Sequence, residues 1–346
     1  MVAERVAGGR GARGLEVDLL LVGAGPVGLY GAYYAGVRGL RVAVVDSLPE
    51  PGGQVTAMYP EKPIYDVGGF PRVLGRDLVA GLVEQAGQYD PTYLLGEEAQ
   101  GLAPDPDAPG RFVVTTSAGT TVRTGTVVVT GGIGTFSPRP LPAGEDLLGR
   151  GLAYFVPSFA DYAGADVVVV GGGDSACDWA LALLPVARSV TLVHRRKAFR
   201  AHAATVEAVH ASGATVLVDA QVTALRAGPD GWVAAAEVTT RDGVLTLPAQ
   251  RVVAALGFVA DLGPLRGWGL DLHDNRHVVV DTRMATNVPG VYAAGDITDY
   301  PGKVRLISVG FGEVATAVNN AAVHLDPEVT LFPGHSSDAA AAPVPV

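Results

Sequence analysis

The sequence predicts an α/β protein made of two βαβ nucleotide-binding units, each with an antiparallel β insert. A strand–glycine turn–helix–strand pattern begins its glycine turn at Gly23 and returns at Gly171. A hairpin pattern follows each copy. Short Val- and Leu-rich runs alternate with helical stretches throughout, which is typical of parallel sheets covered by helices.

Composition limits the possible classes of protein. A chain of 346 residues is long enough for two domains, and 48% hydrophobic with 17% charged residues excludes a disordered protein. No run approaches the ~18–20 apolar residues of a membrane span. The formal net charge of −10 disfavours nucleic acid and anionic membrane as general partners. Cys177 is the single cysteine, so a dithiol pair or a cysteine-rich metal site within one chain is excluded; we expect no metal.

The two ends read as tails. Residues 1–16 are rich in Gly, Arg and Ala and lack the apolar core of a signal peptide, and residues 339–346 are rich in Ala and Pro. We expect both segments to be disordered and the protein to be cytoplasmic.

Each unit can be followed along the chain. The first consists of a buried strand, a helix, a second strand and a hairpin, at Val17–Val22, Leu29–Val37, Arg41–Val45, and Arg111–Thr116 with Thr120–Thr130. The second repeats this order at Asp166–Val170, Asp174–Leu184, Ser189–Val193, and Val233–Thr240 with Val244–Leu247.

The first glycine motif predicts a dinucleotide site. Gly23, Gly25 and Gly28, with Pro26 between them, fit G-x-G-x-x-G directly after a strand. The first glycine allows the tight turn, the second lets a pyrophosphate approach the backbone, and the third lets helix and strand pack closely. Asp46 ends the next strand, where its carboxylate can accept hydrogen bonds from a ribose. The alternative is a glycine turn with a surface acid.

A distant strand indicates FAD at this first site. Val291–Ala294 leads into Gly295 and Asp296, and in flavoproteins with two dinucleotides an aspartate so placed contacts the ribitol chain. An ordinary aspartate in a strand-to-loop turn is the alternative. Thr126–Phe136 is a strand running into a glycine-rich segment, as expected where the chain leaves a flavin domain.

The second glycine motif indicates NADPH. Gly171, Gly173 and Ala176 fit G-x-G-x-x-A, but the next strand ends in His194, Arg195 and Arg196, with Arg200 close behind, instead of an acid. Guanidinium groups bind a ribose 2′-phosphate through charge-assisted hydrogen bonds, so we expect NADPH over NADH. A solvated basic strand end is the alternative.

Longer runs resemble a known family, the thioredoxin-reductase-like ferredoxin/flavodoxin–NADP(+) reductases (type 2). The resemblance covers about residues 17–338. It rests on Gly52–Gln54, Tyr59–Lys62, Tyr65–Pro71, Tyr154–Val156, Gly173–Ala176 with Asp178–Ala180, His194–His202, Leu262–Leu265, Trp268–Leu270, Gly295–Asn320 and Pro333–Ser337.

The resemblance implies two Rossmann-like domains of the thioredoxin reductase type and a homodimer. Residues 17–137 and 259–338 would form the FAD-binding domain and residues 138–258 the NADPH-binding domain. It implies electron transfer between NADPH and ferredoxin or flavodoxin, with hydride passing to flavin N5 and one-electron steps to the carrier.

The resemblance also implies site residues. FAD contacts would come from Asp46, Gln54, Tyr59, Phe136, Asp296 and Ser337. From the second glycine motif and the basic strand end, we expect NADPH contacts from Gly171, Gly173, Asp174, Ser175, His194, Arg195, Arg196 and Arg200. Tyr59 would stack on one face of the flavin ring, and His335 would cover the other face in its own or the partner subunit.

Other assignments stay open at this point. Dithiol chemistry is excluded because Leu152–Asp161, which precedes the second glycine motif, contains no cysteine. An oxidase or monooxygenase acting on a small molecule, or a flavin-binding sensor, would share much of this pattern. An acidic carrier would need a local basic surface, for which the candidates are Lys197, Arg200, Lys303 and Arg305.

Overall fold

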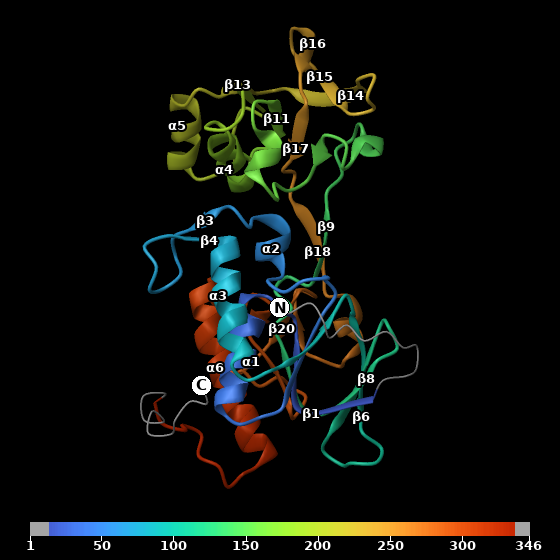
Figure 1. Ribbon diagram of the computed structural model, residues 1–346, viewed down its shortest axis with the longest axis vertical. Coiled ribbons are helices and arrows are strands. Elements are labelled where there is room, and N and C mark those ends of the chain that lie inside the picture. Colours follow the sequence, from blue (N-terminus) through green and yellow to red (C-terminus); the bar gives the residue numbers. More distant parts are fainter. Residues whose placement is uncertain (1–13, 336–346) are drawn as a thin grey trace. The chain divides into compact units, whose positions relative to one another are not determined.

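A computed structural model describes residues 14–335, apart from the side chains of residues 135, 136 and 260. The chain divides into two compact units (Figure 1). The first contains residues 14–56, 64–135 and 261–335, and the second contains residues 57–63 and 136–260. The division expected from the sequence left residues 57–63 with the first unit, whereas these residues make their contacts in the second.

The first unit contains a sheet of order β5-β2-β1-β8-β7-β6, to which β21 adds beside β8. β1 is parallel to both β2 and β8, while β7 pairs antiparallel with β8 and with β6. The strands are β1 (Gly14–Val22), β2 (Val42–Asp46), β5 (Thr92–Leu95), β6 (Ala99–Pro104), β7 (Phe112–Thr116), β8 (Thr121–Val129) and β21 (Val291–Ala293).

Three helices accompany this sheet, and α1 packs against both α3 and α6. They are α1 (Pro26–Val37), α3 (Gly75–Gly87) and α6 (Ile307–Leu325), with the short α2 (Gln54–Met58) running into the segment that joins the second unit. Pro26 occupies the first turn of α1, where a missing N–H group leaves no intrahelical bond unmade. The smaller elements are β3 (Pro63–Ile64), β4 (Val73–Leu74), η3 (Gly263–Gly267), β19 (Leu272–His273), β20 (His277–Val279) and β22 (Thr298–Asp299).

The second unit is built on a parallel sheet of order β10-β17-β11-β12-β13. A separate antiparallel sheet, β14-β15-β16, forms its insert, and α4 packs against α5. The elements are η1 (Glu145–Leu147), β10 (Leu152–Ala153), η2 (Phe159–Tyr162), β11 (Asp166–Val170), α4 (Asp174–Leu183), β12 (Ser189–Val193), α5 (Ala203–Ala211), β13 (Thr215–Leu217), β14 (Gln221–Ala227), β15 (Val233–Thr240), β16 (Gly243–Pro248) and β17 (Arg251–Ala254). β9 (Thr135–Pro138) and β18 (Phe258–Asp261) pair with each other where the chain passes between the units.

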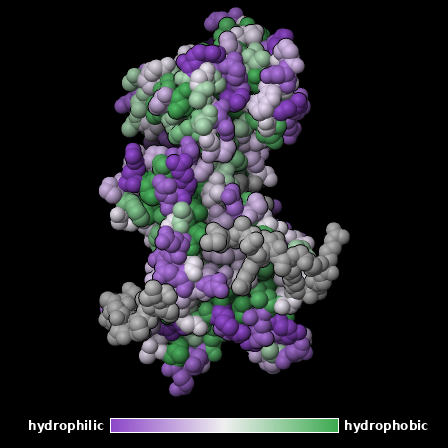
Figure 2. Space-filling view, viewed as in Figure 1, coloured by the Kyte–Doolittle hydropathy of each residue, from purple (hydrophilic) through white to green (hydrophobic). Residues whose placement is uncertain are grey.

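Strand β11 shows how the core of the second unit is organised. Val167 and Val169 belong to one buried cluster, and Val168 and Val170 belong to another. Successive side chains of a strand point to opposite faces, so the run of four valines fills both sides of a doubly covered sheet. On the face of the molecule seen in Figure 2, apolar areas alternate with polar ones.

The α/β class and both predicted hairpins are confirmed, while several boundaries differ. β1 begins at Gly14 because residues 14–16 pair with residues 121–123 of β8, so the expected tail over 1–16 is wrong for its last three residues. The rest of the two expected tails, residues 1–13 and 339–346, lies outside the described residues. Within residues 14–335, no helix has the length and apolar character needed to cross a membrane.

Candidate functional site

The first glycine turn lies between β1 and α1, and each of its three glycines meets a different environment. A Cβ atom added to Gly23, whose φ is +119°, would lie 2.5 Å from the carbonyl oxygen of Thr130. One added to Gly28 would lie 1.8 Å from the carbonyl oxygen of Gly23. One added to Gly25 would meet nothing within 4 Å. The turn therefore leaves open space above Gly25, at the amino end of α1, where an anionic group can approach the backbone.

Asp46 faces this turn from the end of β2. One carboxylate oxygen accepts a hydrogen bond from the Ala24 amide at 2.6 Å, and the other accepts from the Leu48 amide at 2.9 Å. Burial raises the pKa of Asp46, and these two amide donors act in the opposite direction. The carboxylate is therefore held rigidly beside the glycine turn.

The Gly52–Gln54 run packs onto the same turn. The Gly52 amide donates to the carbonyl oxygen of Ala24 at 2.8 Å, and a Cβ atom on Gly53 would lie 3.0 Å from Cα of Gly25. Gln54 begins α2, and its Nε2 lies 3.0 Å from where a Cβ atom on Gly132 would be. Three segments far apart in sequence therefore meet at one place in the first unit.

The Gly295–Asp296 turn follows β21 and rests on a buried ion pair. Glu313 accepts from the Gly295 amide at 2.7 Å, from the Tyr300 hydroxyl at 2.5 Å and from Lys303 at 2.5 Å, and Lys303 also donates to the Gly295 carbonyl oxygen at 2.9 Å. The Asp296 carboxylate makes no hydrogen bond within the part of the chain that the structure describes, and burial raises its pKa. A half-buried acceptor without a donor suits a ligand that carries hydroxyl groups.

Sequence reasoning missed Glu313 and misplaced Lys303. The expectation that Lys303 contributes to a basic surface is wrong, because its side chain is 3% exposed and paired with Glu313. Glu313 shares the buried face of α6 with Gly310, Val314 and Ala317. A lone acid on the apolar face of a predicted helix was the signal that could have identified it.

The second glycine turn, between β11 and α4, repeats the arrangement. A Cβ atom on Gly171 would lie 2.4 Å from the Ala255 carbonyl oxygen, whereas one on Gly173 would meet nothing within 4 Å. Ala176 is fully buried at the close-packing position. Ser175 lies exposed in the first turn of α4.

The predicted basic residues lie on a loop that folds against this turn. The Arg200 amide donates to the carbonyl oxygen of Gly172 at 2.7 Å, and the His202 amide donates to the Asp174 carboxylate at 2.9 Å. Arg195, Arg196 and Arg200 are exposed, and their guanidinium groups form no hydrogen bond or ion pair within the described residues. They are therefore available to an anionic ligand.

His194 differs from these arginines. It is 8% exposed, its Nε2 lies 3.1 Å from the Ala198 carbonyl oxygen, and its ring fills the space where a Cβ atom on Gly172 would be. Its ring also packs against Phe199 with centroids 4.8 Å apart. The buried ring of His194 therefore packs between the glycine turn and the loop that carries the arginines, whereas the arginines themselves face the solvent.

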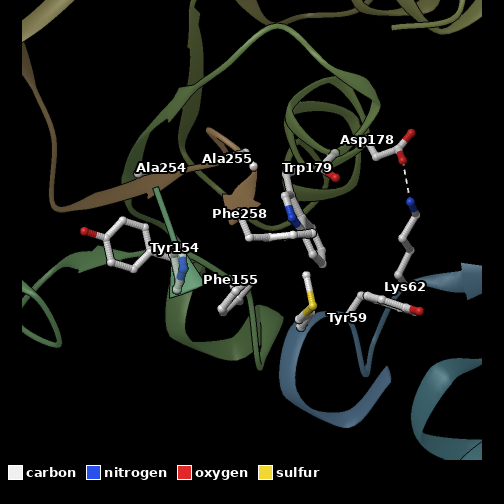
Figure 3. A pocket seen from close by; sticks show the side chains of 13 residues that line it. Tyr59, Lys62, Tyr154, Phe155, Asp178, Trp179, Ala254, Ala255 and Phe258 are labelled. Carbon is white, nitrogen blue, oxygen red and sulfur yellow. Dashed lines mark hydrogen bonds and ion pairs between the residues drawn. The ribbon is translucent and has the colours of Figure 1, made fainter. Parts of the chain in front are cut away.

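An open pocket lies in the second unit beside this turn. It is lined largely by aromatic and apolar side chains: Met58, Tyr59, Lys62, Pro138, Tyr154, Phe155, Ser175, Asp178, Trp179, Ala254, Ala255, Gly257 and Phe258 (Figure 3). Lys62 is ion-paired with Asp178 at its side, and the Glu61 carboxylate accepts from the Phe159 amide at 2.9 Å. Tyr59, for which the family resemblance implies stacking on the flavin, lies in the wall of this pocket.

Three other predicted residues lie at the limits of the described chain. The Phe136 side chain and Ser337 are outside the described part. His335 is exposed and packs edge-on against Phe332, with ring centroids 5.2 Å apart. The preceding residues are held at the end of α1, because Arg38 donates to the carbonyl oxygen of Thr330 at 2.9 Å.

Cys177 lies fully buried in α4, and burial raises the pKa of its thiol to about 11. A buried protonated thiol is a poor nucleophile. Among the described residues, no group of three His, Cys, Asp or Glu side chains is placed to hold a metal ion.

Comparison with known proteins agrees with this geometry. The family model for pyridine nucleotide-disulphide oxidoreductases matches residues 17–321. A protein from Nocardioides sp. named ferredoxin–NADP reductase is 65% identical over 325 residues, which cover 94% of this chain and 98% of that protein. The chain belongs to the pyridine nucleotide-disulphide oxidoreductases, and among them to the ferredoxin–NADP reductases. The family resemblance expected from the sequence is confirmed.

More distant members of the family extend the comparison. A ferredoxin–NADP reductase from Thermus thermophilus is 47% identical over 94% of this chain and 98% of its own. The crystal structure of T. acidophilum thioredoxin reductase superposes with a TM-score of 0.73 at 25% identity, covering 89% of this chain and 98% of the other. A Lactococcus lactis thioredoxin reductase has the same fold, with a TM-score of 0.71 at 22% identity over 89% of this chain and 99% of that one. The expected thioredoxin reductase fold is therefore confirmed as well.

Proposed function

We propose that this protein is an FAD-dependent oxidoreductase that transfers electrons between NADPH and ferredoxin. The observation that carries the proposal is the presence of two open glycine turns with different second-strand ends. The first is faced by a rigid carboxylate, and the second by three arginines that have no partner among residues 14–335. Relatives at 60–65% identity over most of the chain carry the name ferredoxin–NADP reductase, which supports the choice of carrier.

FAD would bind to the first unit. Gly23, Gly25, Pro26 and Gly28 would present the backbone of the turn to its pyrophosphate, because the space above Gly25 is open. Asp46 would accept a hydrogen bond from the ribose, and Gln54 would contact the flavin end of the ligand. Asp296, which has no hydrogen-bond donor among the described residues, would accept hydrogen bonds from the ribitol hydroxyls. Phe136, Tyr59 and Ser337 stay predictions from the family resemblance.

NADPH would bind to the second unit. Gly171, Gly173 and Ser175 would receive its pyrophosphate at the amino end of α4, and Asp174 would hold the neighbouring loop through the His202 amide. Arg195, Arg196 and Arg200 would bind the 2′-phosphate by charge-assisted hydrogen bonds. His194 would position that loop instead of touching the ligand, since its ring is buried against Gly172.

The bound flavin would supply the conversion between a two-electron hydride donor and a one-electron carrier, and the protein would bind, orient and shield the reactants. No protein thiol is needed as a relay. Cys177 is the only cysteine and is buried, so electrons would leave directly to the external carrier. Flavodoxin is the alternative carrier of the same kind.

A homodimer would explain the position of His335. Arg38, at the carboxyl end of α1, donates a hydrogen bond to Thr330 and so holds the chain there. Helix α1 has 12 residues and is therefore roughly 18 Å long at 1.5 Å per residue. The open glycine turn lies at the other end of that helix. Residues 331 and 332 are 53% and 61% exposed apolar side chains that a second subunit would cover. His335 would then serve the partner's flavin.

A cytoplasmic location stays a prediction.

The decisive experiment is anaerobic stopped-flow reduction of the purified protein by NADPH, followed by mixing with oxidised ferredoxin. Loss of flavin absorbance with NADPH and its return with ferredoxin supports the assignment. Loss without return contradicts ferredoxin as the carrier and favours a small-molecule acceptor. An unchanged spectrum on adding NADPH contradicts the NADPH assignment.

A further inference from the structure

We infer that the segment Gln54–Lys62, which we call the linking segment, couples the two dinucleotide sites, and that Lys62 and Asp178 are the positioning residues that close this link. The inference rests on the proposed binding of FAD and NADPH at the two glycine turns. It goes beyond that binding, because it makes the flavin respond to whether the second site is occupied.

One end of the linking segment is fixed at the first glycine turn. α2 begins at Gln54, and a Cβ atom on the preceding Gly53 would lie 3.0 Å from Cα of Gly25 in that turn. The Thr56 hydroxyl donates to the carbonyl oxygen of Pro51 at 2.9 Å, which ties α2 to the chain just before it. A displacement of α2 would therefore be felt where FAD is proposed to bind.

The other end of the linking segment is fixed in the second unit. The boundary between the units falls inside α2, because residues 57–63 belong to the second unit. Tyr59 packs against the buried cluster that contains Trp179 of α4. The Glu61 carboxylate accepts from the Phe159 amide at 2.9 Å, and the Phe159 ring meets Trp179 edge-on with centroids 6.3 Å apart. α2 has five residues and is roughly 7.5 Å long, so it joins the two attachments directly.

The ion pair between Lys62 and Asp178 is the weakest of these attachments. The Lys62 side chain reaches across to Asp178 on α4 (Figure 3). The two side chains are 37% and 29% exposed, and a pair so accessible to water contributes little net stability. A modest change in the charge beside it is therefore enough to shift the linking segment between a docked and a loosened state.

A ligand at the second glycine turn supplies such a change. Ser175 lies in the first turn of α4, where the pyrophosphate would bind, and Asp178 follows three residues later on the same face of the helix. Ser175, Asp178 and Lys62 line one pocket. The anionic pyrophosphate would repel the Asp178 carboxylate and attract the Lys62 ammonium, which weakens the ion pair. The linking segment would then loosen, and Gln54 would transmit the change to the first glycine turn.

The test uses the oxidised holoprotein and 2′-phospho-ADP-ribose, which carries the 2′-phosphate and the pyrophosphate but has no nicotinamide ring to touch the flavin. Isothermal titration calorimetry establishes that this ligand binds. Visible circular dichroism reports the surroundings of the bound flavin, and the fluorescence of free FAD after dilution reports its release. Saturation with the ligand should alter the flavin dichroism and speed the release of FAD roughly two- to fivefold, the range expected for loss of an exposed ion pair.

Variants of the ion pair separate coupling from binding. Lys62→Met and Asp178→Asn should still bind the ligand, but they should release FAD at the faster rate with or without it. The charge-swapped variant Lys62→Asp/Asp178→Lys should restore slow release and the response, because the two charges attract again. Arg188→Met is the matched control: it breaks the ion pair with Asp166 in the same unit, away from the linking segment, and should respond as the wild type does.

The contrary outcomes distinguish the coupling from the binding sites themselves. A wild type that binds the ligand without any change in flavin dichroism or FAD release would overturn the coupling and leave both sites intact. The same conclusion would follow if Lys62→Met responded as the wild type does, or if the charge-swapped variant stayed insensitive. If the wild type binds no ligand at all, the NADPH assignment is wrong and the coupling falls with it.

Discussion

Lys303 and Glu313 form an ion pair with 2.5 Å between Nζ and Oε1, and their side chains are only 3% and 5% exposed. Between them they bond both the amide and the carbonyl oxygen of Gly295. This pair therefore fixes the turn that presents Asp296, and breaking it leaves a buried charge without its partner.

We expect Glu313→Gln to destabilise the protein by about 3–5 kcal/mol, because Lys303 would remain charged and buried. Thermal unfolding of the apoprotein, with and without added FAD, measures the loss, and FAD affinity should fall with it. The double variant Lys303→Met/Glu313→Gln should recover part of the stability, since no uncompensated charge remains. A single variant as stable as the wild type would contradict the role given to the pair.

The second and third glycines of the first motif should respond differently to alanine. Gly25→Ala should fold normally, because the added Cβ atom meets nothing within 4 Å and the φ of −68° suits any residue. It should nevertheless lose FAD, because the methyl group occupies the approach to the backbone. Gly28→Ala should fail to fold stably, because its Cβ atom would lie 1.8 Å from the Gly23 oxygen. Flavin content and circular dichroism separate the two cases. A Gly25→Ala variant that retains FAD would contradict the proposal that the FAD pyrophosphate approaches the backbone at Gly25.

Replacing Arg195 and Arg196 together by alanine should raise the KM for NADPH by roughly 10- to 100-fold, since hydrogen bonds to charged groups contribute about 1.5–3 kcal/mol. The KM for NADH should hardly change, because NADH has no 2′-phosphate. Steady-state kinetics with both nucleotides provide the measurement. Arg188→Ala, which removes a cation already paired with Asp166, serves as the control. An equal loss with both nucleotides would argue against 2′-phosphate recognition.

The raised pKa of Asp46 predicts opposite pH trends for stability and for FAD binding. A carboxyl group whose folded pKa exceeds its unfolded value of 3.8 holds its proton more tightly in the folded state. Its contribution to stability is therefore complete below pH 3.8 and is lost as the pH rises through the folded pKa. FAD affinity should increase over the same window, because in the ionised form both oxygens can accept a ligand hydrogen bond in addition to those from the Ala24 and Leu48 amides. Asp46→Asn should remove both trends, as urea unfolding and FAD titration between pH 4 and 7 would reveal.

Added salt should slow the reduction of ferredoxin if local basic residues attract an acidic carrier. Lys197 and Arg200 are exposed, and Arg305 is 40% exposed beside Asp299, whereas Lys303 cannot take part. Lys197→Glu should reduce the rate at low salt and converge with the wild type at high salt. Stopped-flow rates across a salt series measure this, and a flat response would speak against electrostatic steering.

The sequence alone determined the two glycine turns and the elements around them. Glycine motifs, runs of valine and the HRR strand end are local patterns, and backbone sterics and strand periodicity translate such patterns directly into turns, helices and buried strands. The sequence predicts a dinucleotide site in each half, with an acid at one and arginines at the other. This prediction depends only on residues within about 30 positions of each turn.

Only the tertiary structure decided which distant residues meet. It buried Lys303 against Glu313, turned His194 inward beneath Gly172, and joined Lys62 to Asp178 across 116 positions of sequence. Residues 57–63 carry no local pattern that would assign them to the second unit. Such pairings depend on how separate elements pack, because a charged or aromatic side chain has the same local preferences whether it meets solvent or a partner.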